Sequence, residues 1–276
     1  IEIGGDFTND GTLKNGQTLT IKNGSLNNSG TIENSGTIKI GGDLNNSGTI
    51  SSNSNIEVCG NVTLSGGELS GNYTLILNNI PRINKDFKVT GTEDKTKKIK
   101  NLTVQNGVYY FNIADTFTIE GTLSNSANGE VHLKSGNLII NNYTGEGKIN
   151  LYEGATLTIT NYAGTGTIYL QEGATLTIEN GATIPNLEIQ TTDETDFATI
   201  STNGNLTISS ASYNSGDIKT NGNITLPSTE STTNEIGNLL IESGELTIET
   251  LHAENITNKD FLEATISLEA NDILNE

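Results

Sequence analysis

Acidic side chains are the residues of this chain best suited to catalysis by their type and spacing. Asp193, Glu194 and Asp196 stand close together in a stretch of Thr, Asp and Glu. Paired carboxylates act as general acid and base in glycoside hydrolysis. A glycan-processing enzyme would also need a groove of converging acidic, basic and aromatic residues, yet this chain has a single arginine and no tryptophan. We therefore expect a solvated acidic loop and no enzymatic activity.

Residues for nucleophilic or metal chemistry are equally sparse. His132 and His252 lie far apart, with no Ser or Cys motif beside either. The stretches 6–11 and 43–48 resemble the start of a calcium-binding loop, but the closing glutamate is missing from both. We predict turns at these two stretches, and neither a metal nor a cofactor. Cys59 is the single cysteine, and the order Ile-Glu-Val-Cys predicts a small residue facing the core.

Tyrosines at repeated positions could form a sugar-binding platform. Tyr143 and Tyr162 occupy matching positions in two neighbouring repeats, with Tyr152 and Tyr169 close to them. Stacked outward-facing aromatic rings bind the apolar faces of sugars. Single exposed tyrosines are common on strand surfaces, so we expect isolated surface tyrosines first, with glycan stacking by the four as the functional alternative.

Threonines also repeat in register. Thr156 and Thr158 align with Thr175 and Thr177, which is similar to the flat threonine arrays of ice-binding solenoids. Two repeats carry the pair, so the pattern is short.

A basic stretch from 81 to 100 breaks the repeat. It holds seven of the fourteen basic residues and one of three prolines. We predict an insertion that leaves the coil, either as a solvated hairpin or as a contact element. Its candidate contact residues are Arg82, Lys85, Lys88, Lys95, Lys97, Lys98 and Lys100.

The elements that position all these residues are short repeated strands. Residues 148–159 return almost unchanged as 167–178, and each copy holds two alternating runs joined by a Glu-Gly-Ala turn. Burial of a few aliphatic side chains does not offset the ordering of one such unit, so the units must stack. The sequence predicts an all-β fold, a right-handed parallel β-helix (β-solenoid) with coils of about 18–20 residues.

Turn sequences mark the corners of the first 79 residues. Asn-Ser-Gly recurs there and Asn-Asp-Gly occurs at 9–11, and both are turn sequences because Asn and Gly accept a positive φ. Equivalent asparagines in successive coils should form amide ladders and favour parallel register. We predict one solenoid over 1–276, interrupted at about 81–100. Residues 252–276 form either a cap or a continuation into a longer parent chain.

The charge of the chain excludes several partners. Its net charge is −19, which repels nucleic acid and anionic membranes. No apolar run approaches 18 residues, so we expect no membrane insertion by this segment.

The Asn-Ser-Gly-Thr-Ile and Gly-Asn-Leu-Thr-Ile repeats resemble the β-helical shafts of filamentous-haemagglutinin-type adhesins and autotransporter passengers of Gram-negative bacteria. The Asn-Pro-Asn-Leu and Asn-Pro-Asn-Gly-Ile motifs of the secretion domain do not occur. The resemblance implies a secreted, surface-attached, non-catalytic stalk or binding segment. Its expected partners are glycans or proteins of a host or neighbouring cell. The leading alternative is a structural subunit that assembles with further copies of itself into a fibre or surface layer, and the third is a glycan-processing enzyme.

Overall fold

In the computed structural model of the chain, the backbone is described for residues 1–79, 83–190, 198–209, 211–214, 217–220, 224–225, 236–241, 245–258 and 261–275, and side chains for 1–79, 83–189 and 198–209. The chain forms two compact units, residues 1–141 and 142–276. Both consist of parallel strands stacked coil upon coil, which confirms the predicted parallel β-solenoid.

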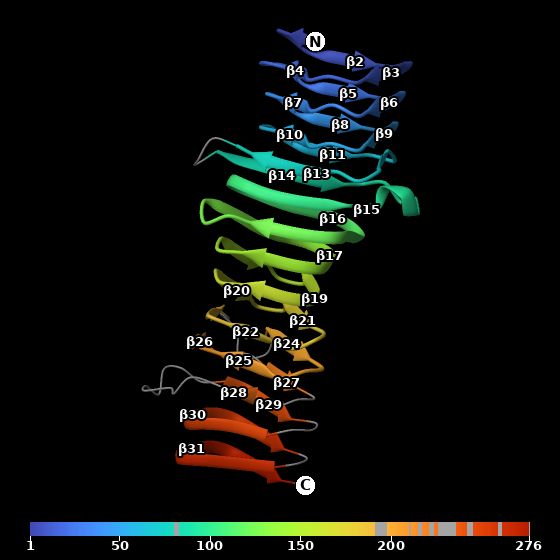
Figure 1. Ribbon diagram of the computed structural model, residues 1–276. Helices are drawn as coiled ribbons and strands as arrows, with labels where there is room; N and C mark the ends of the chain where they lie inside the picture. Colours follow the sequence, from blue (N-terminus) through green and yellow to red (C-terminus); the bar gives the residue numbers. More distant parts are fainter. Residues whose placement is uncertain are drawn as a thin grey trace. The chain divides into compact units, whose positions relative to one another are not determined.

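The described strands of the first unit stack in three columns (Figure 1). The first column holds β1 (Glu2–Ile3), β4 (Leu19–Ile21), β7 (Ile38–Ile40), β10 (Ile56–Val58) and β13 (Thr74–Asn78). The second holds β2 (Phe7–Asn9), β5 (Leu26–Asn28), β8 (Leu44–Asn46), β11 (Val62–Leu64) and β14 (Asn84–Val89). The third holds β3 (Thr12–Asn15), β6 (Thr31–Asn34), β9 (Thr49–Ser52) and β12 (Glu68–Ser70).

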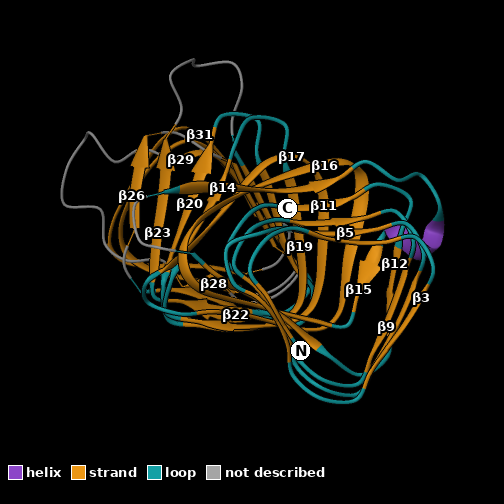
Figure 2. Ribbon diagram, turned by 90° about the horizontal axis from the view of Figure 1, so that it is seen from above, coloured by secondary structure: helices purple, strands orange, loops and turns teal. Residues whose placement is uncertain are grey.

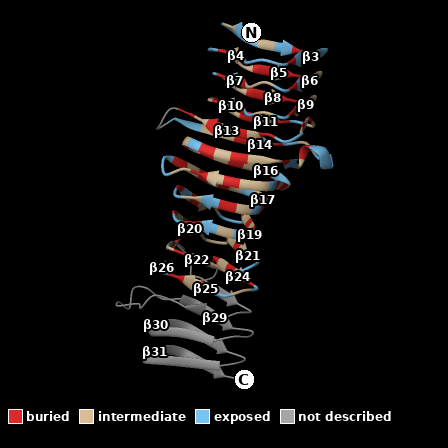
Figure 3. Cartoon of the chain, viewed as in Figure 1, coloured by how far each residue is buried: buried red, intermediate tan, exposed pale blue. Residues whose placement is uncertain are grey.

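Longer strands follow these columns. β16 (Asn101–Asn125) pairs in parallel with β13, with β14 and with the short β15 (Lys98–Ile99). The next strand is β17 (Gly129–Gly145). Buried and partly exposed residues alternate along β16 (Figure 3), as expected for strands with one face toward a core.

The core of the first coils is aliphatic. Leu19 pairs with Ile38 and Ile38 pairs with Ile56, and all three are at most 1% exposed. Each inward side chain therefore packs on its equivalent in the next coil, so that stability accumulates along the stack. Around β14 the core becomes aromatic: the ring of Phe87 stacks on that of Phe111 at 4.7 Å and contacts that of Phe117 at 5.5 Å.

Glycine is needed at the corners because the coils approach closely. A Cβ on Gly30 would lie 2.1 Å from the Gly11 carbonyl oxygen, and one on Gly48 would lie 2.1 Å from that of Gly30. Neither glycine has a positive φ. The predicted positive φ is therefore wrong for these two glycines, and backbone contact between coils explains why glycine is needed there.

In the second unit, β18 (Lys148–Leu151) pairs with β20 (Thr167–Gln171), and β19 (Thr156–Gly164) pairs with β21 (Thr175–Ile178). The near-identical repeats thus lie in register, as predicted. Parallel pairing continues through β22 (Ala182–Ile184), β23 (Asn186–Gln190), β24 (Thr199–Thr202), β25 (Leu206–Ile208), β26 (Ala211–Asn214), β27 (Asp217–Thr220), β28 (Ile224–Thr225), β29 (Ile236–Ile241), β30 (Glu245–Asn258) and β31 (Phe261–Asn275).

The basic stretch is largely part of the coil. In β14, Phe87 pairs with Val62 and with Phe111, so Asn84–Val89 is a regular rung. Thr90 and Gly91 still donate to the Leu64 carbonyl, and the chain leaves the stack at 92–96, where the 3-10 helix η1 (Asp94–Thr96) lies beside β12 (Figure 2). It returns as β15. The prediction of one insertion over 81–100 is wrong for these two strands, and Pro81 and Arg82 lie outside the described residues.

Cys59 does not face the core. Because Ile56 and Val58 point inward, Glu57 and Cys59 alternate to the outer side, and the thiol is half-buried. Partial burial raises the pKa of the thiol, the carboxylate of Glu57 adds to this effect, and Lys85 opposes it.

No helix among the described residues is long and apolar enough to cross a membrane.

Candidate functional site

The predicted tyrosine platform is contradicted at its centre. The rings of Tyr143 and Tyr162 do stack, with centroids 5.3 Å apart, but Tyr143 is 1% exposed. Gly164 packs against both rings, since a Cβ there would lie 2.4 Å from Tyr143 and 2.8 Å from Tyr162. The Tyr162 hydroxyl is also buried, and burial raises its pKa. The outward orientation predicted for Tyr143 is wrong, because its ring fills space that the glycine leaves in the coil.

The other two tyrosines of the predicted platform are partly exposed. Tyr169 pairs in register with Asn150 on one side and with Glu188 on the other. The ammonium of Lys148 lies 5.8 Å from the centroid of the Tyr169 ring, within the range of a cation–π contact. Tyr152 is half-buried at the end of β18. Glycan stacking by Tyr152 and Tyr169 stays a prediction.

Most candidate contact lysines lie close to carboxylates. Lys88, Lys95, Lys97 and Lys98 lie 2.8 to 3.1 Å from acidic side chains, in the pairs Lys88–Asp86, Lys95–Glu93, Lys97–Asp115 and Lys98–Glu120. The hydrogen bond with Lys97 lowers the pKa of Asp115. Lys85 and Lys100 are half-buried. The region therefore presents mixed charge, and its role in binding stays a prediction.

The residues considered for catalysis do not form a described site. Asp193, Glu194 and Asp196 lie outside the described residues, as does the side chain of His252. His132 lies on β17 with its Nε2 atom 3.0 Å from a carboxylate oxygen of Glu130. Within the described part of the chain, no three His, Cys, Asp or Glu side chains are grouped as metal ligands.

The threonine array extends further than the sequence indicated. Thr156 and Thr158 pair with Thr175 and Thr177, and these pair in turn with Thr199 and Ser201 on β24. The third rung does not follow the repeat of the sequence, because Thr199 stands 24 positions after its partner Thr175, whereas Thr175 stands 19 positions after Thr156.

Buried asparagines form a ladder inside the first coils, as predicted. The Asn9 amide donates to the Asn28 Oδ1 atom at 2.8 Å, and the Asn28 amide donates to the Asn46 Oδ1 atom at 2.8 Å. These side chains are 8%, 2% and 0% exposed. Each amide also donates to a backbone carbonyl of the next coil, such as Thr49 for Asn28. The ladder satisfies buried polar groups and fixes the register of the coils.

A second relay of hydrogen bonds joins the corners before the second column. The Ser25 N–H donates to the Asp6 carboxylate at 2.8 Å, and the Asp43 N–H donates to the Ser25 hydroxyl at 3.1 Å. The Asn61 N–H donates to Asp43 at 2.7 Å, and the Asp86 N–H donates to Asn61 at 2.9 Å. Each corner therefore orients the strand that follows it in the next coil.

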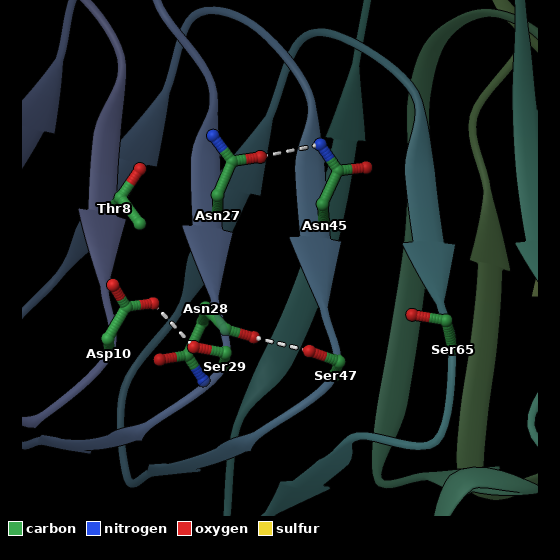
Figure 4. A pocket seen from close by; sticks show the side chains of 8 residues that line it. All are labelled: Thr8, Asp10, Asn27, Asn28, Ser29, Asn45, Ser47 and Ser65. Atoms are coloured by element: carbon green, nitrogen blue, oxygen red, sulfur yellow. Dashed lines mark hydrogen bonds between the residues drawn. The ribbon is translucent and has the colours of Figure 1, made fainter.

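A shallow groove lined by polar residues lies on the outer side of the second column (Figure 4). Thr8, Asn27 and Asn45 stand at equivalent positions of β2, β5 and β8 and form one wall. The other wall follows the strand ends, and the groove is lined by Thr8, Asp10, Asn27, Asn28, Ser29, Asn45, Ser47 and Ser65. Four of these residues belong to the stretches 6–11 and 43–48, so the turns that resemble calcium loops line this groove.

The groove offers hydrogen-bonding groups at every rung. The Asn45 amide donates to the Asn27 Oδ1 atom at 2.9 Å, which orients both side chains. The Ser29 hydroxyl donates to the Asp10 carboxylate at 2.6 Å, and the Ser47 hydroxyl donates to the Asn28 carbonyl at 3.3 Å. Asp10 is the one ionisable residue of the lining. Such a surface suits binding and lacks the second carboxylate that glycoside hydrolysis requires.

No protein-family model, curated protein or solved structure matches this chain.

Proposed function

We propose that this chain is a non-catalytic β-solenoid segment of a secreted bacterial surface adhesin. Its stacked coils would act as a stalk, and its polar outer side would bind a glycan or protein of a host or neighbouring cell. The buried asparagine ladder carries the proposal, because it ties each coil to the next and needs no globular core. The resemblance of the turn repeats to adhesin shafts supports the extracellular location.

The composition of the groove supports binding over catalysis. Its lining combines hydroxyls and amides with the single carboxylate of Asp10, whereas hydrolysis of glycosidic bonds uses a pair of carboxyl groups. Oriented amides such as those of Asn27 and Asn45 are ready to accept or donate hydrogen bonds without reorganisation.

Beads coated with the purified chain provide the test. Attachment of coated beads to epithelial or bacterial cells, with no release of reducing sugars from a panel of polysaccharides, is the expected result. Beads that attach to one another and not to cells would favour the fibre or surface-layer alternative. Turnover of a polysaccharide would overturn the proposal in favour of an enzyme.

A further inference from the structure

We infer that the groove lined by Thr8, Asn27, Asn45, Asp10, Ser29, Ser47 and Ser65 binds a linear, uncharged polysaccharide chain that lies along the stack of coils. The inference rests on the proposed adhesive function and names the ligand of that surface. Three properties of the groove carry it: its direction, its hydrogen-bonding groups and its charge.

The groove runs across the strands. Thr8 pairs with Asn27, and Asn27 pairs with Asn45, so their side chains repeat once per coil. Neighbouring strands lie about 4.8 Å apart, which is close to the length of one sugar residue in an extended β-linked chain. A polymer lying along the stack can therefore meet one rung of hydrogen-bonding groups at each sugar residue, and its contacts add up along the chain.

The lining matches the hydroxyl groups of sugars. In the bond between Asn45 and Asn27, Asn45 donates and Asn27 accepts, so this bond does not use the Asn27 amide hydrogens, the second Asn45 amide hydrogen or the Asn45 oxygen. Ser65 and Ser47 are exposed on the opposite wall. Protein interfaces depend on buried aromatic and arginine anchors, and the lining has no pocket with such residues. A hydroxyl-rich chain fits this surface better than a protein does.

The charge favours an uncharged chain. Asp10 is a carboxylate at one end of the groove, and the whole chain carries a net charge of −19. In register with Thr8, Asn27 and Asn45, β11 carries Thr63 and β14 carries Lys88, and the Lys88 ammonium lies 3.1 Å from Asp86. Acidic polysaccharides are therefore repelled without a compensating cation.

Titration of the full chain followed by backbone NMR tests the inference, with cellohexaose and chitohexaose as neutral probes and hexagalacturonate as the anionic probe. We expect a neutral probe to shift amide signals of β2, β5, β8 and β11, and the anionic probe to bind at least several-fold more weakly. Shifts confined to other strands, equal binding of the anionic probe, or no shift with any probe would overturn it.

Two variants localise the binding. Asn45→Ala removes an amide of the groove and should weaken binding about 2- to 10-fold. The matched control is Asn161→Ala, which removes an amide of an exposed ladder elsewhere, between Asn142 and Asn180, and should leave the affinity unchanged. Ser47→Leu fills the groove while removing only one long hydrogen bond, and should abolish binding in a chain that still unfolds cooperatively. Equal losses in both asparagine variants would refute the site.

The bead assay separates this inference from the function on which it rests. If beads coated with the Ser47→Leu variant still attach to cells, the adhesive function stands and binding at the groove is refuted. If Ser47→Leu abolishes attachment but neutral hexasaccharides do not inhibit it, the groove binds a protein, and the inference of a polysaccharide ligand is overturned. Binding of hexasaccharides without attachment of beads would support the groove and overturn the adhesive function.

Discussion

Two asparagine ladders in this chain make the same bonds in opposite surroundings. In the first unit, Asn9, Asn28 and Asn46 are buried, and their amides bond at 2.8 Å. In the second unit, Asn161 donates to Asn142 at 3.0 Å and Asn180 donates to Asn161 at 2.8 Å, on an exposed surface. The bond lengths of the two ladders are alike, although the amides donate to the following coil in the first unit and to the preceding coil in the second.

The two ladders differ in whether water can replace a lost hydrogen-bond partner. A buried amide that loses its partner keeps an unsatisfied polar group, which costs about 1–3 kcal/mol for each group. An exposed amide exchanges its lost partner for water. An amide ladder therefore specifies register where it is buried and contributes little stability where it is exposed, so the following variants should affect the two units unequally.

The largest effect should come from the centre of the buried ladder. Asn28→Ala removes the amide that donates to Asn46 and to the Thr49 carbonyl, takes away the acceptor of the Asn9 amide, and opens a cavity. We expect a loss of about 2–5 kcal/mol in the free energy of unfolding, measured by urea denaturation. Asn161→Ala is the matched control and should cost less than about 1 kcal/mol. Equal losses would contradict the comparison.

The close approach of coils can be tested at two glycines of equivalent turns. In Gly30→Ala the new Cβ meets the Gly11 backbone and should cost about 1–3 kcal/mol or more, because the backbone must shift. Gly11→Ala is the control, since its Cβ would meet nothing within 4 Å. Thermal unfolding of the two variants checks the difference. A similar shift in both would mean that backbone entropy rather than contact explains the glycines.

Stability should fall at high pH in both units. Burial raises the pKa of Tyr73, Tyr109 and Tyr162 above the value near 10 that tyrosine has in an unfolded chain. The unfolded state then loses its protons first, so the stabilisation is complete below about pH 10 and decreases above it. For Tyr73, which is 2% exposed, the loss is about 1.4 kcal/mol per pH unit between the two pKa values. Urea denaturation from pH 8 to 11 measures it, and a flat profile would contradict the burial.

Two tyrosine-to-phenylalanine variants should act in opposite directions. The Tyr73 hydroxyl donates to the Leu69 carbonyl at 3.2 Å and accepts from the Lys100 N–H at 3.4 Å, so Tyr73→Phe should destabilise by about 1 kcal/mol. The buried Tyr162 hydroxyl has no hydrogen-bond partner among the described residues, so Tyr162→Phe should be neutral or stabilising by up to about 1 kcal/mol. Melting temperatures measured at pH 7 compare the two variants, and destabilisation by Tyr162→Phe would reveal a missing partner.

Repetition decided how much of the fold could be predicted. Residues 148–159 and 167–178 are nearly identical, so their register could be read directly, and it is confirmed. The strand β14 was missed because Asn84–Val89 carries charged residues and no repeat motif, and because its coil is longer. Its place is set by Phe87, whose packing on Phe111 depends on contacts between coils rather than on local pattern.

The site was predicted less well, for a physical reason seen at Tyr162. Ile159 points inward, but Thr160 and Asn161 both lie outward at a corner, so strict alternation fails and the ring of Tyr162 turns toward that of Tyr143. Of the polar groove, only the two turn stretches that resemble calcium loops could be identified from the sequence. The groove forms only when Thr8, Asn27 and Asn45 of three successive coils align side by side, and the sequence of one coil does not show this alignment.

The buried ladder also bears on how such a chain changes length over generations. Asn28 bonds to residues nineteen positions before and eighteen positions after it, so each coil contributes one complete rung. A duplication of one whole coil would insert a rung that satisfies both neighbours, whereas a partial duplication would leave amides unpaired in the interior. Duplication of whole coils would therefore keep every amide of the buried ladder paired.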